Sequence, residues 1–206
     1  TELRYHFLMG VEAWIGNEED KDVVRGAFDH WKDVGVGLSF IEVVDASEAE
    51  VRIGFDRDDG SWSYVGRQGL GRPMTERTMN FGWRLAGWDY GRDTALHEIG
   101  HTLGLPHEHQ NPNAGIVWDE EAVYRYFGGP PNSWDRQKAF YNILRKLSPD
   151  IVRGSDWDPN SVMHYRFPAG LIVDPEEYLS APLVPRGDLS DVDQELVRQF
   201  YPPPAP

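Results

Sequence analysis

Two histidines and one glutamate are the residues of this chain best placed to do chemistry. His97 and His101 lie four residues apart, so on a helix both face one side, one turn apart along the axis. Glu98 follows the first histidine, where its carboxylate can reach a water molecule held near the two rings without binding the ion itself. Two imidazoles that converge on one point beside a carboxylate are what a zinc hydrolase needs.

A third histidine follows where the helix is expected to end. Gly104 can adopt the left-handed conformation that stops a helix, and Pro106 has no N–H to continue one. His107 then arrives as the third ligand, which leaves the fourth position of the metal open for water. The pattern HExxHxxGxxH therefore predicts one catalytic Zn²⁺ held by His97, His101 and His107, with a zinc-bound water that Glu98 activates as a general base.

Further segments resemble one family. HExxHxxGxxH followed downstream by a methionine-containing turn is the metzincin pattern, and SVMHY at 161–165 resembles the astacin version of that turn. GSWSYVGR at 60–67 is similar to an astacin stretch in which a cysteine occupies the place of Ser61, and HEHQNPNA from His107 resembles the segment after the third ligand. The chain is thus identified as an astacin-like zinc metalloendopeptidase, over most of residues 1–201.

The resemblance implies roles for three more residues. Tyr165 stands where astacins have a tyrosine that ligates zinc and then swings away to hydrogen-bond the developing oxyanion, so it is expected to be both a metal ligand and catalytic. Met163 matches the residue that packs beneath the zinc site, and Glu108 matches a glutamate that anchors the mature N-terminus or another buried donor. The strand over 78–83 is implied to be a sheet edge that holds an extended polypeptide.

Periodic stretches, with this resemblance, predict an α/β (α+β) metzincin-like fold. A strand over 3–8 precedes a helix that Asn17 can cap, and strands over 38–44, 51–55 and 78–83 follow. The helix carries an apolar stripe made of Val23, Ala27, Phe28, Trp31 and Val34. With the zinc helix, these elements predict an upper lobe, about 1–105, of a twisted mixed sheet with two long helices, in which residues 51–55 form a half-buried strand.

The remaining residues predict a smaller, mostly irregular and helical C-terminal lobe over about 106–201. Helices are expected over 120–127, over 133–147 with Ser133 as the cap, and over 191–200 with Ser190 as the cap. We expect one metallopeptidase catalytic domain over 1–201, with the active-site cleft between the lobes. Residues 202–206 are expected to be a loose Pro-rich tail.

Composition limits the partners. The net charge of −14 over 206 residues disfavours nucleic acid and anionic membrane surfaces, and no apolar run is long enough to span a membrane. The chain has no cysteine, so it must obtain from packing the rigidity that astacins take from disulfides. Cysteine content therefore gives no information on whether the protein works in an oxidising or a reducing compartment. We expect a monomer that acts on polypeptides and is secreted; an intracellular location is also compatible with the lack of cysteine.

Two other functions stay open at this point. One is a zinc hydrolase that cleaves a non-protein amide, and the other is a zinc-stabilised binding module that has lost catalysis, against which the intact Glu98 argues. His6, His30, His109 and His164 are interpreted as structural or surface residues, and the acidic loop 56–61 as a turn rather than a calcium site. The segment LVPRG at 183–187 matches a thrombin-cleavage linker of recombinant proteins, but its internal position and Asp188 favour a native loop.

Overall fold

The computed structural model describes residues 1–150 and 156–203, which divide into two compact units. The first comprises Thr1–Leu105 and Gly187–Pro206, and the second comprises Pro106–Arg186. Residues 187–201, which the sequence predicts to lie in the C-terminal lobe, belong to the first unit in this division. Of the expected Pro-rich tail, residues 204–206 lie outside the described part of the chain.

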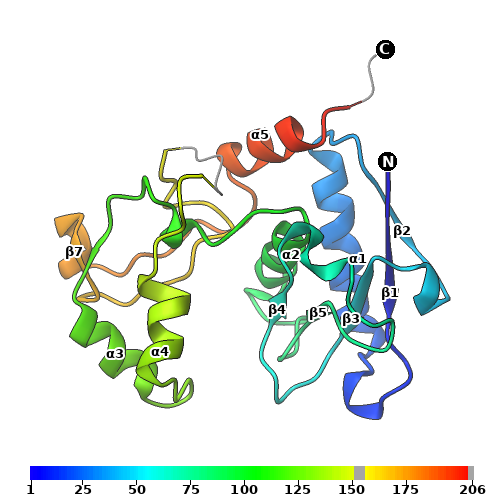
Figure 1. Ribbon diagram of the computed structural model, residues 1–206, viewed down its shortest axis with the longest axis horizontal. Coiled ribbons are helices and arrows are strands. Elements are labelled where there is room, and N and C mark those ends of the chain that lie inside the picture. Colours follow the sequence, from blue (N-terminus) through cyan, green and yellow to red (C-terminus); the bar gives the residue numbers. More distant parts are fainter. Residues whose placement is uncertain (151–155, 204–206) are drawn as a thin grey trace. The chain divides into compact units, whose positions relative to one another are not determined.

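The first unit is built on a five-stranded mixed sheet with strand order β2-β1-β3-β5-β4 (Figure 1). All neighbours are parallel except β4, which pairs antiparallel with β5. The strands are β1 (Glu2–Phe7), β2 (Ser39–Glu42), β3 (Val51–Gly54), β4 (Trp62–Ser63) and β5 (Met79–Asn80). The predicted mixed sheet is confirmed.

Two details of the predicted sheet were wrong. All of β3 is buried rather than half-buried, because it lies inside the sheet between β1 and β5. Arg52 tolerates that burial because its guanidinium donates to the carbonyls of Ala49, Arg72 and Glu76. The strand within residues 78–83 is not an edge strand: β5 has a neighbour on each side, and the edge strands are β2 and β4.

Helix α1 (Glu18–Asp33) covers the sheet and begins as predicted. Asn17 caps it by accepting the N–H of Asp20 at 2.8 Å. Ala27, Phe28 and Trp31 of the expected stripe are buried, whereas Val23 and Val34 are only partly buried and Val24 is fully buried instead. The ring of Phe28 stacks on Tyr5 of β1 at 4.2 Å, which joins the helix to the sheet.

Helix α2 (Gly91–Thr102) and the segment that precedes it are both bonded to α1. The indole N–H of Trp31 donates to the carbonyl of Leu96 at 3.1 Å. Asp20, which is fully buried at the start of α1, accepts the N–H groups of Leu85 and Ala86 at 2.8 Å each, just before α2 begins. These bonds lower the pKa of the Asp20 carboxyl against the opposing effect of its burial. The start of α2 is thereby fixed to the rest of the unit.

Hydrogen bonds fix the segment before β4. Ser61, at the place of a cysteine in astacins, accepts the N–H of Gly82 through its hydroxyl at 3.1 Å. The buried amide of Asn80 donates to the carbonyls of Asp56 and Gly60 and accepts the N–H of Asp56. Arg77 pairs with the carboxylates of this loop, which agrees with a turn rather than a calcium site. Polar contacts therefore tie this edge of the sheet without a disulfide.

Helix α5 (Asp191–Phe200) completes the first unit. Ser190 and Asp193 form a capping box at its start, as the sequence predicts for Ser190. At its other end, Tyr201 donates its hydroxyl to the carbonyl of Leu103, and the Tyr201 carbonyl accepts the N–H of Gly37. These contacts explain why α5 belongs with the N-terminal residues rather than with the second unit.

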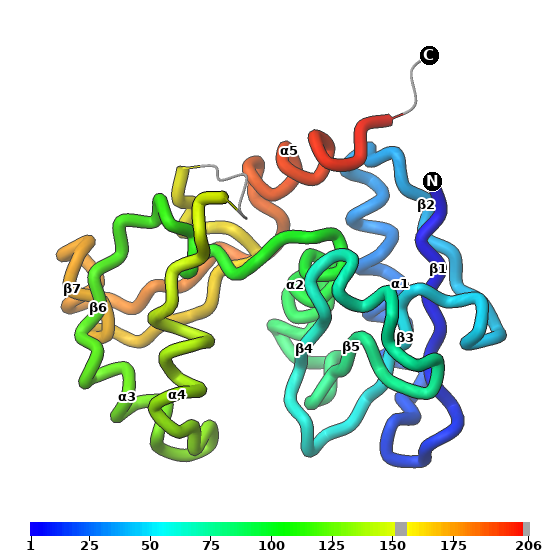
Figure 2. The backbone as a smooth tube through the Cα atoms, viewed as in Figure 1, coloured from blue at the N-terminus to red at the C-terminus, as the bar shows by residue number. Residues whose placement is uncertain are grey.

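The second unit is mostly irregular and helical, as predicted (Figure 2). Helices α3 (Glu120–Gly128) and α4 (Arg136–Ala139) pack together, and β6 (Val117–Trp118) pairs antiparallel with β7 (Ile172–Asp174). The helix expected over 133–147 is shorter, and Asp135 rather than Ser133 caps it. Among the described residues, the short helical turns are Glu12–Trp14, Ala46–Glu48, Gly66–Gly69, Glu108–Gln110, Phe140–Leu144 and Glu176–Leu179. No helix among the described residues is long and apolar enough to cross a membrane.

Candidate metal centre

Helix α2 presents His97 and His101 on one side, as the spacing predicts. Their ring centroids lie 4.7 Å apart with the planes nearly perpendicular. Nδ1 of the buried His101 lies 2.8 Å from the carbonyl oxygen of Leu105, so this nitrogen carries the proton and donates it. Burial, with a smaller effect of His97, lowers the pKa of His101 to about 3. The ring therefore stays neutral at physiological pH and offers the Nε2 lone pair to a metal.

The end of α2 returns the chain toward the two histidines. Gly104 has φ of 100°, its N–H donates to the carbonyl of His101, and the N–H of Leu105 donates to the carbonyl of Gly100. This pair of bonds is a Schellman motif, which glycine favours because it has no Cβ. The predicted helix stop is confirmed, and His107 follows two residues after Leu105.

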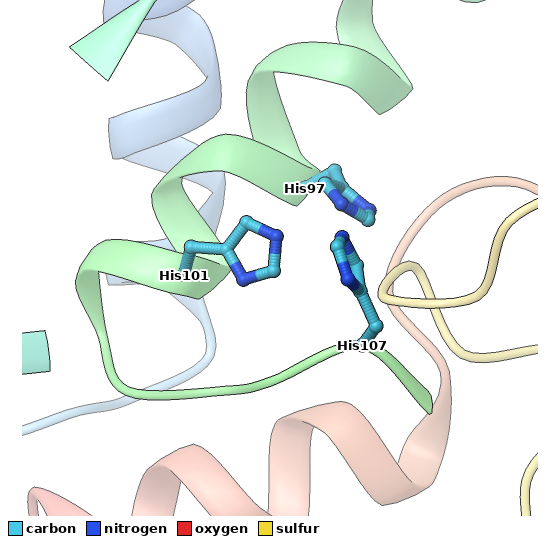
Figure 3. A group of neighbouring side chains, drawn as sticks. All are labelled: His97, His101 and His107. Atoms are coloured by element: carbon cyan, nitrogen blue, oxygen red, sulfur yellow. The ribbon is translucent and has the colours of Figure 1, made fainter. Parts of the chain in front are cut away.

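The three predicted histidine ligands come together (Figure 3). One ligand nitrogen from each of His97, His101 and His107 lies within 4.8 Å of the others, and the rings are turned toward a common point. Among the described residues, they form the one group of three or more metal-binding side chains. Three neutral imidazoles are a donor set that suits zinc, and they leave a coordination position open.

Glu98 lies beside these ligands in a setting that is unfavourable for a carboxylate. The side chain is 5% exposed, and its Oε2 is buried with no hydrogen-bond partner. Burial raises the pKa of the Glu98 carboxyl to about 8 in the absence of a metal ion. An orphaned buried acceptor next to a metal-binding triad fits a bound cation with a water molecule, which would satisfy it.

The metal-free protein should show this cost in its pH dependence. Because the folded-state pKa of Glu98 lies above the ordinary value of 4.5, the folded protein keeps a proton that the unfolded chain loses between about pH 4.5 and about pH 8. Stability from this group is therefore lost as pH rises through that window. At pH 4.5, the free energy of unfolding of metal-free Glu98→Gln should be nearly that of wild type. Above pH 4.5 the variant should become the more stable of the two, by up to about 1.4 kcal/mol for each pH unit.

Chemical denaturation of chelator-treated samples from pH 4 to pH 9 measures this difference. The same comparison after zinc is restored is the control, since a cation favours the charged carboxylate and should remove the advantage of the glutamine. Parallel pH profiles for the two metal-free proteins would contradict the assignment of the buried charge to Glu98.

Tyr165 lies against the third histidine within the second unit. Its ring centroid is 4.4 Å from that of His107 and 4.9 Å from that of His109. The turn that carries Tyr165 is joined to the same segment, because the carbonyl of the buried Met163 accepts the N–H of Glu108 at 3.1 Å. Met163 therefore supports the His107 segment through its backbone. A zinc-binding or catalytic role of Tyr165 stays a prediction.

Glu108 holds backbone and amide donors of the second unit. Its Oε1 accepts the N–H of Asp158 and the side-chain amide of Asn111, both at 3.0 Å. Of the two implied roles, this contact corresponds to anchoring a buried donor. The ammonium group of Thr1 lies 3.4 Å from the carbonyl oxygen of Gly37.

The remaining histidines have structural contacts, as interpreted from the sequence. His109 and His164 are buried, and they bond the carbonyls of Asn142 and Tyr165, respectively. Neither belongs to the metal-binding motif, but the His109 ring packs on His107 and the His164 ring lies next to His109. His6 bonds the carbonyl of Val43, and His30 bonds the carboxylate of Asp188. In the sequence, the closeness of His109 to the site is indicated by its position two residues after His107.

A protein-family comparison decides the family. The model described as Astacin, a peptidase family, matches residues 13–117, which include the three histidines and Glu98. The chain belongs to the astacin family. The predicted membership of the astacin family is confirmed. The family match also supports the predicted peptidase region with one catalytic zinc.

Relatives of this astacin-family chain agree. It is 26% identical to protein SpAN of Strongylocentrotus purpuratus over 87% of its length and 28% of the relative, and 29% identical to bone morphogenetic protein 1 of Xenopus laevis over 89% of its length and 24% of the relative. The chain thus spans about a quarter of these relatives. A solved structure of myroilysin superposes with a TM-score of 0.84 at 28% identity, covering 100% of this chain and 94% of that one. The metzincin-like fold class is confirmed.

Proposed function

We propose that this protein is a zinc-dependent endopeptidase that hydrolyses polypeptides bound in extended form. The observation that carries the proposal is the convergence of His97, His101 and His107 beside a buried glutamate. Membership of a peptidase family supports polypeptides as the substrate class.

The residues have distinct roles in this proposal. His97, His101 and His107 would hold the ion, with Tyr165 as a further ligand. Zinc, when bound there, supplies a Lewis acid that acidifies water and polarises a carbonyl group. The Glu98 carboxylate accepts the proton of the attacking water and returns it to the leaving amine, because it is placed next to the ligands without having to bind the ion. The Tyr165 hydroxyl donates a hydrogen bond to the oxyanion.

The edge of the sheet supports an extended substrate. Strand β4 pairs with β5 on one side only, and no other described strand covers its second side. The hydroxyl of Ser63 lies 3.0 Å from that of Thr102, so this edge is joined to α2 one residue after His101. An extended peptide could add to β4 through backbone hydrogen bonds, which requires no particular side chain.

The site also bears on the two alternatives. A zinc-stabilised binding module would gain nothing from Glu98, whose burial without a hydrogen-bond partner is costly. Hydrolysis of a non-protein amide would use the same histidines, but it would make no use of a free strand edge. Secretion and a monomeric state remain expectations, which export of the full-length protein and its mass in solution would test.

Zinc removal tests the proposal. We expect the protein to cut an unfolded, unlabelled polypeptide at internal bonds, to lose this activity by at least about a hundredfold after treatment with a zinc chelator, and to regain it with one equivalent of Zn²⁺. Mass spectrometry of the fragments measures both the loss and the internal cut sites. Activity that survives complete zinc removal, or release of terminal residues only, would contradict a zinc endopeptidase.

A further inference from the structure

The segment Leu-Val-Pro-Arg-Gly-Asp at 183–188 lies where the chain passes from one unit to the other. The second unit ends at Arg186 and the first resumes at Gly187. The only other covalent connection between the units is the peptide bond between Leu105 and Pro106. Hydrolysis between Arg186 and Gly187 would therefore leave the units joined by a single link.

The Arg186 side chain is exposed, and the residues next to it lie outside regular secondary structure. Val184 is 51% exposed and Arg186 is exposed, and neither lies in a helix or strand. Within the described part of the chain, no hydrogen bond reaches the backbone of Val184, Arg186 or Gly187, and no carboxylate pairs with the Arg186 guanidinium. A trypsin-class serine protease prefers arginine before the cut, because its pocket for that residue carries an aspartate. Backbone without hydrogen bonds is also easier for a protease to bind in extended form.

The chain on both sides of Arg186 is fixed. Leu183 exchanges two backbone hydrogen bonds of 2.9 Å with Phe167, and Asp188 binds His30 at 2.6 Å and Arg92 at 3.3 Å. Pro185 is buried, so a protease must draw the segment away from the surface before it can cut. These contacts show that the segment is an integral loop of the fold.

Asp93, in the first turn of α2, borders the residue that a cut would turn into a new amino terminus. Its Oδ1 accepts the N–H of Asp188 at 3.1 Å. Its Oδ2 lies 2.8 Å from the position that a Cβ on Gly187 would occupy, and Gly187 has φ of 83°. This close approach explains why a glycine stands at this position, and it puts a carboxylate beside the Gly187 main chain.

We propose that the bond between Arg186 and Gly187 is a processing site for a trypsin-class serine protease and that Asp93 retains the new amino terminus. Hydrolysis breaks the C–N bond, adds the hydroxyl of water to the Arg186 carbonyl carbon, and gives its proton to the Gly187 nitrogen. The products are a carboxylate at Arg186 and, after protonation at neutral pH, an ammonium group at Gly187 beside the Asp93 carboxylate. Opposite charges at this range attract, so Gly187 stays in place.

Limited digestion with trypsin tests the processing site. The zinc-loaded Glu98→Gln variant is the starting protein, so that self-digestion does not contribute. We expect the first products to be residues 1–186 and 187–206, still co-eluting as one particle because the contacts of Asp188 and Tyr201 persist. Arg186→Gln should slow the first cut at least tenfold, whereas Arg125→Gln, which changes an exposed arginine within α3, should leave it unchanged. A first cut at any other bond would overturn the proposal.

Acylation of the two amino termini in the cut protein tests the role of Asp93. The exposed terminus of Thr1 is the internal reference. We expect the Gly187 amine to react about tenfold more slowly than that of Thr1, which corresponds to an ammonium stabilised by one pKa unit, and Asp93→Asn to remove the difference. If the two amines reacted equally fast in the cut protein that retains Asp93, this carboxylate would not hold the new terminus. This comparison is made within one protein and does not depend on the folding of a variant.

Discussion

Glu98→Gln should lower kcat/KM for polypeptide cleavage by about 10²–10⁴-fold while the protein still binds one zinc ion. The physical reason is that glutamine keeps the size of the side chain but cannot accept the proton of the attacking water or return it to the leaving amine. Because the glutamate is buried and its Oε2 has no hydrogen-bond partner, the neutral amide should also be tolerated structurally. Initial rates on an unfolded polypeptide, with zinc content measured on the same samples, give both quantities.

The matched control is Glu120→Gln, which makes the same change at an exposed position of α3 and should leave kcat/KM unaltered. If Glu98→Gln retained full activity with its zinc, the general base would be another group. If it lost zinc together with activity, Glu98 would be needed for metal binding, and the assignment of a purely proton-transferring role would be wrong.

Tyr165→Phe should lower kcat by about 10²–10³-fold, equivalent to the 2.7–4 kcal/mol that one oxyanion hydrogen bond contributes, with little change in KM. Phenylalanine keeps the ring that packs at 4.4 Å from His107 and 4.9 Å from His109, so only the hydroxyl is lost. A bond made mainly in the transition state affects turnover rather than ground-state binding. Steady-state kinetics over a range of peptide concentrations separates the two parameters.

Tyr124→Phe is the control, because it removes a phenol hydroxyl from the same unit. Tyr124 packs against the hydrophobic core of this unit, and the Arg136 guanidinium lies over its ring. This substitution should leave kcat unchanged. An unaltered kcat in Tyr165→Phe would exclude the oxyanion role, and a rise in KM alone would assign Tyr165 to substrate binding instead.

The metal centre was predictable because its information is local. His97, His101 and His107 lie on one helix and the turn that follows it, and Gly104 determines that turn through its own conformation. Tyr165 is remote in sequence, and only the resemblance of SVMHY to a known turn pointed to it. The position of a residue within a short stretch can be derived from spacing, but a distant partner cannot.

The features that the sequence did not predict depend on contacts between residues far apart in the chain. The place of β5 inside the sheet depends on its pairing with β4, which the sequence of β5 does not specify. The contacts of Asp20 with Leu85 and Ala86 join residues 65 and 66 positions apart, so no local pattern shows that a carboxylate in the first turn of α1 is fully buried. Likewise, α5 has a clear capping signal, but its unit is determined by contacts of Tyr201 with Gly37 and Leu103.

Zinc stoichiometry of the purified chain, with X-ray absorption at the zinc edge, tests the central claim most directly. The account predicts one zinc per chain, coordinated by three imidazole nitrogens at about 2.0–2.1 Å, and loss of that zinc in His101→Ala. His109→Ala, which removes a neighbouring histidine that bonds the Asn142 carbonyl instead, should retain three imidazoles on the metal. A chain that binds no zinc after incubation with excess ion, or a spectrum without three nitrogen ligands, would contradict it.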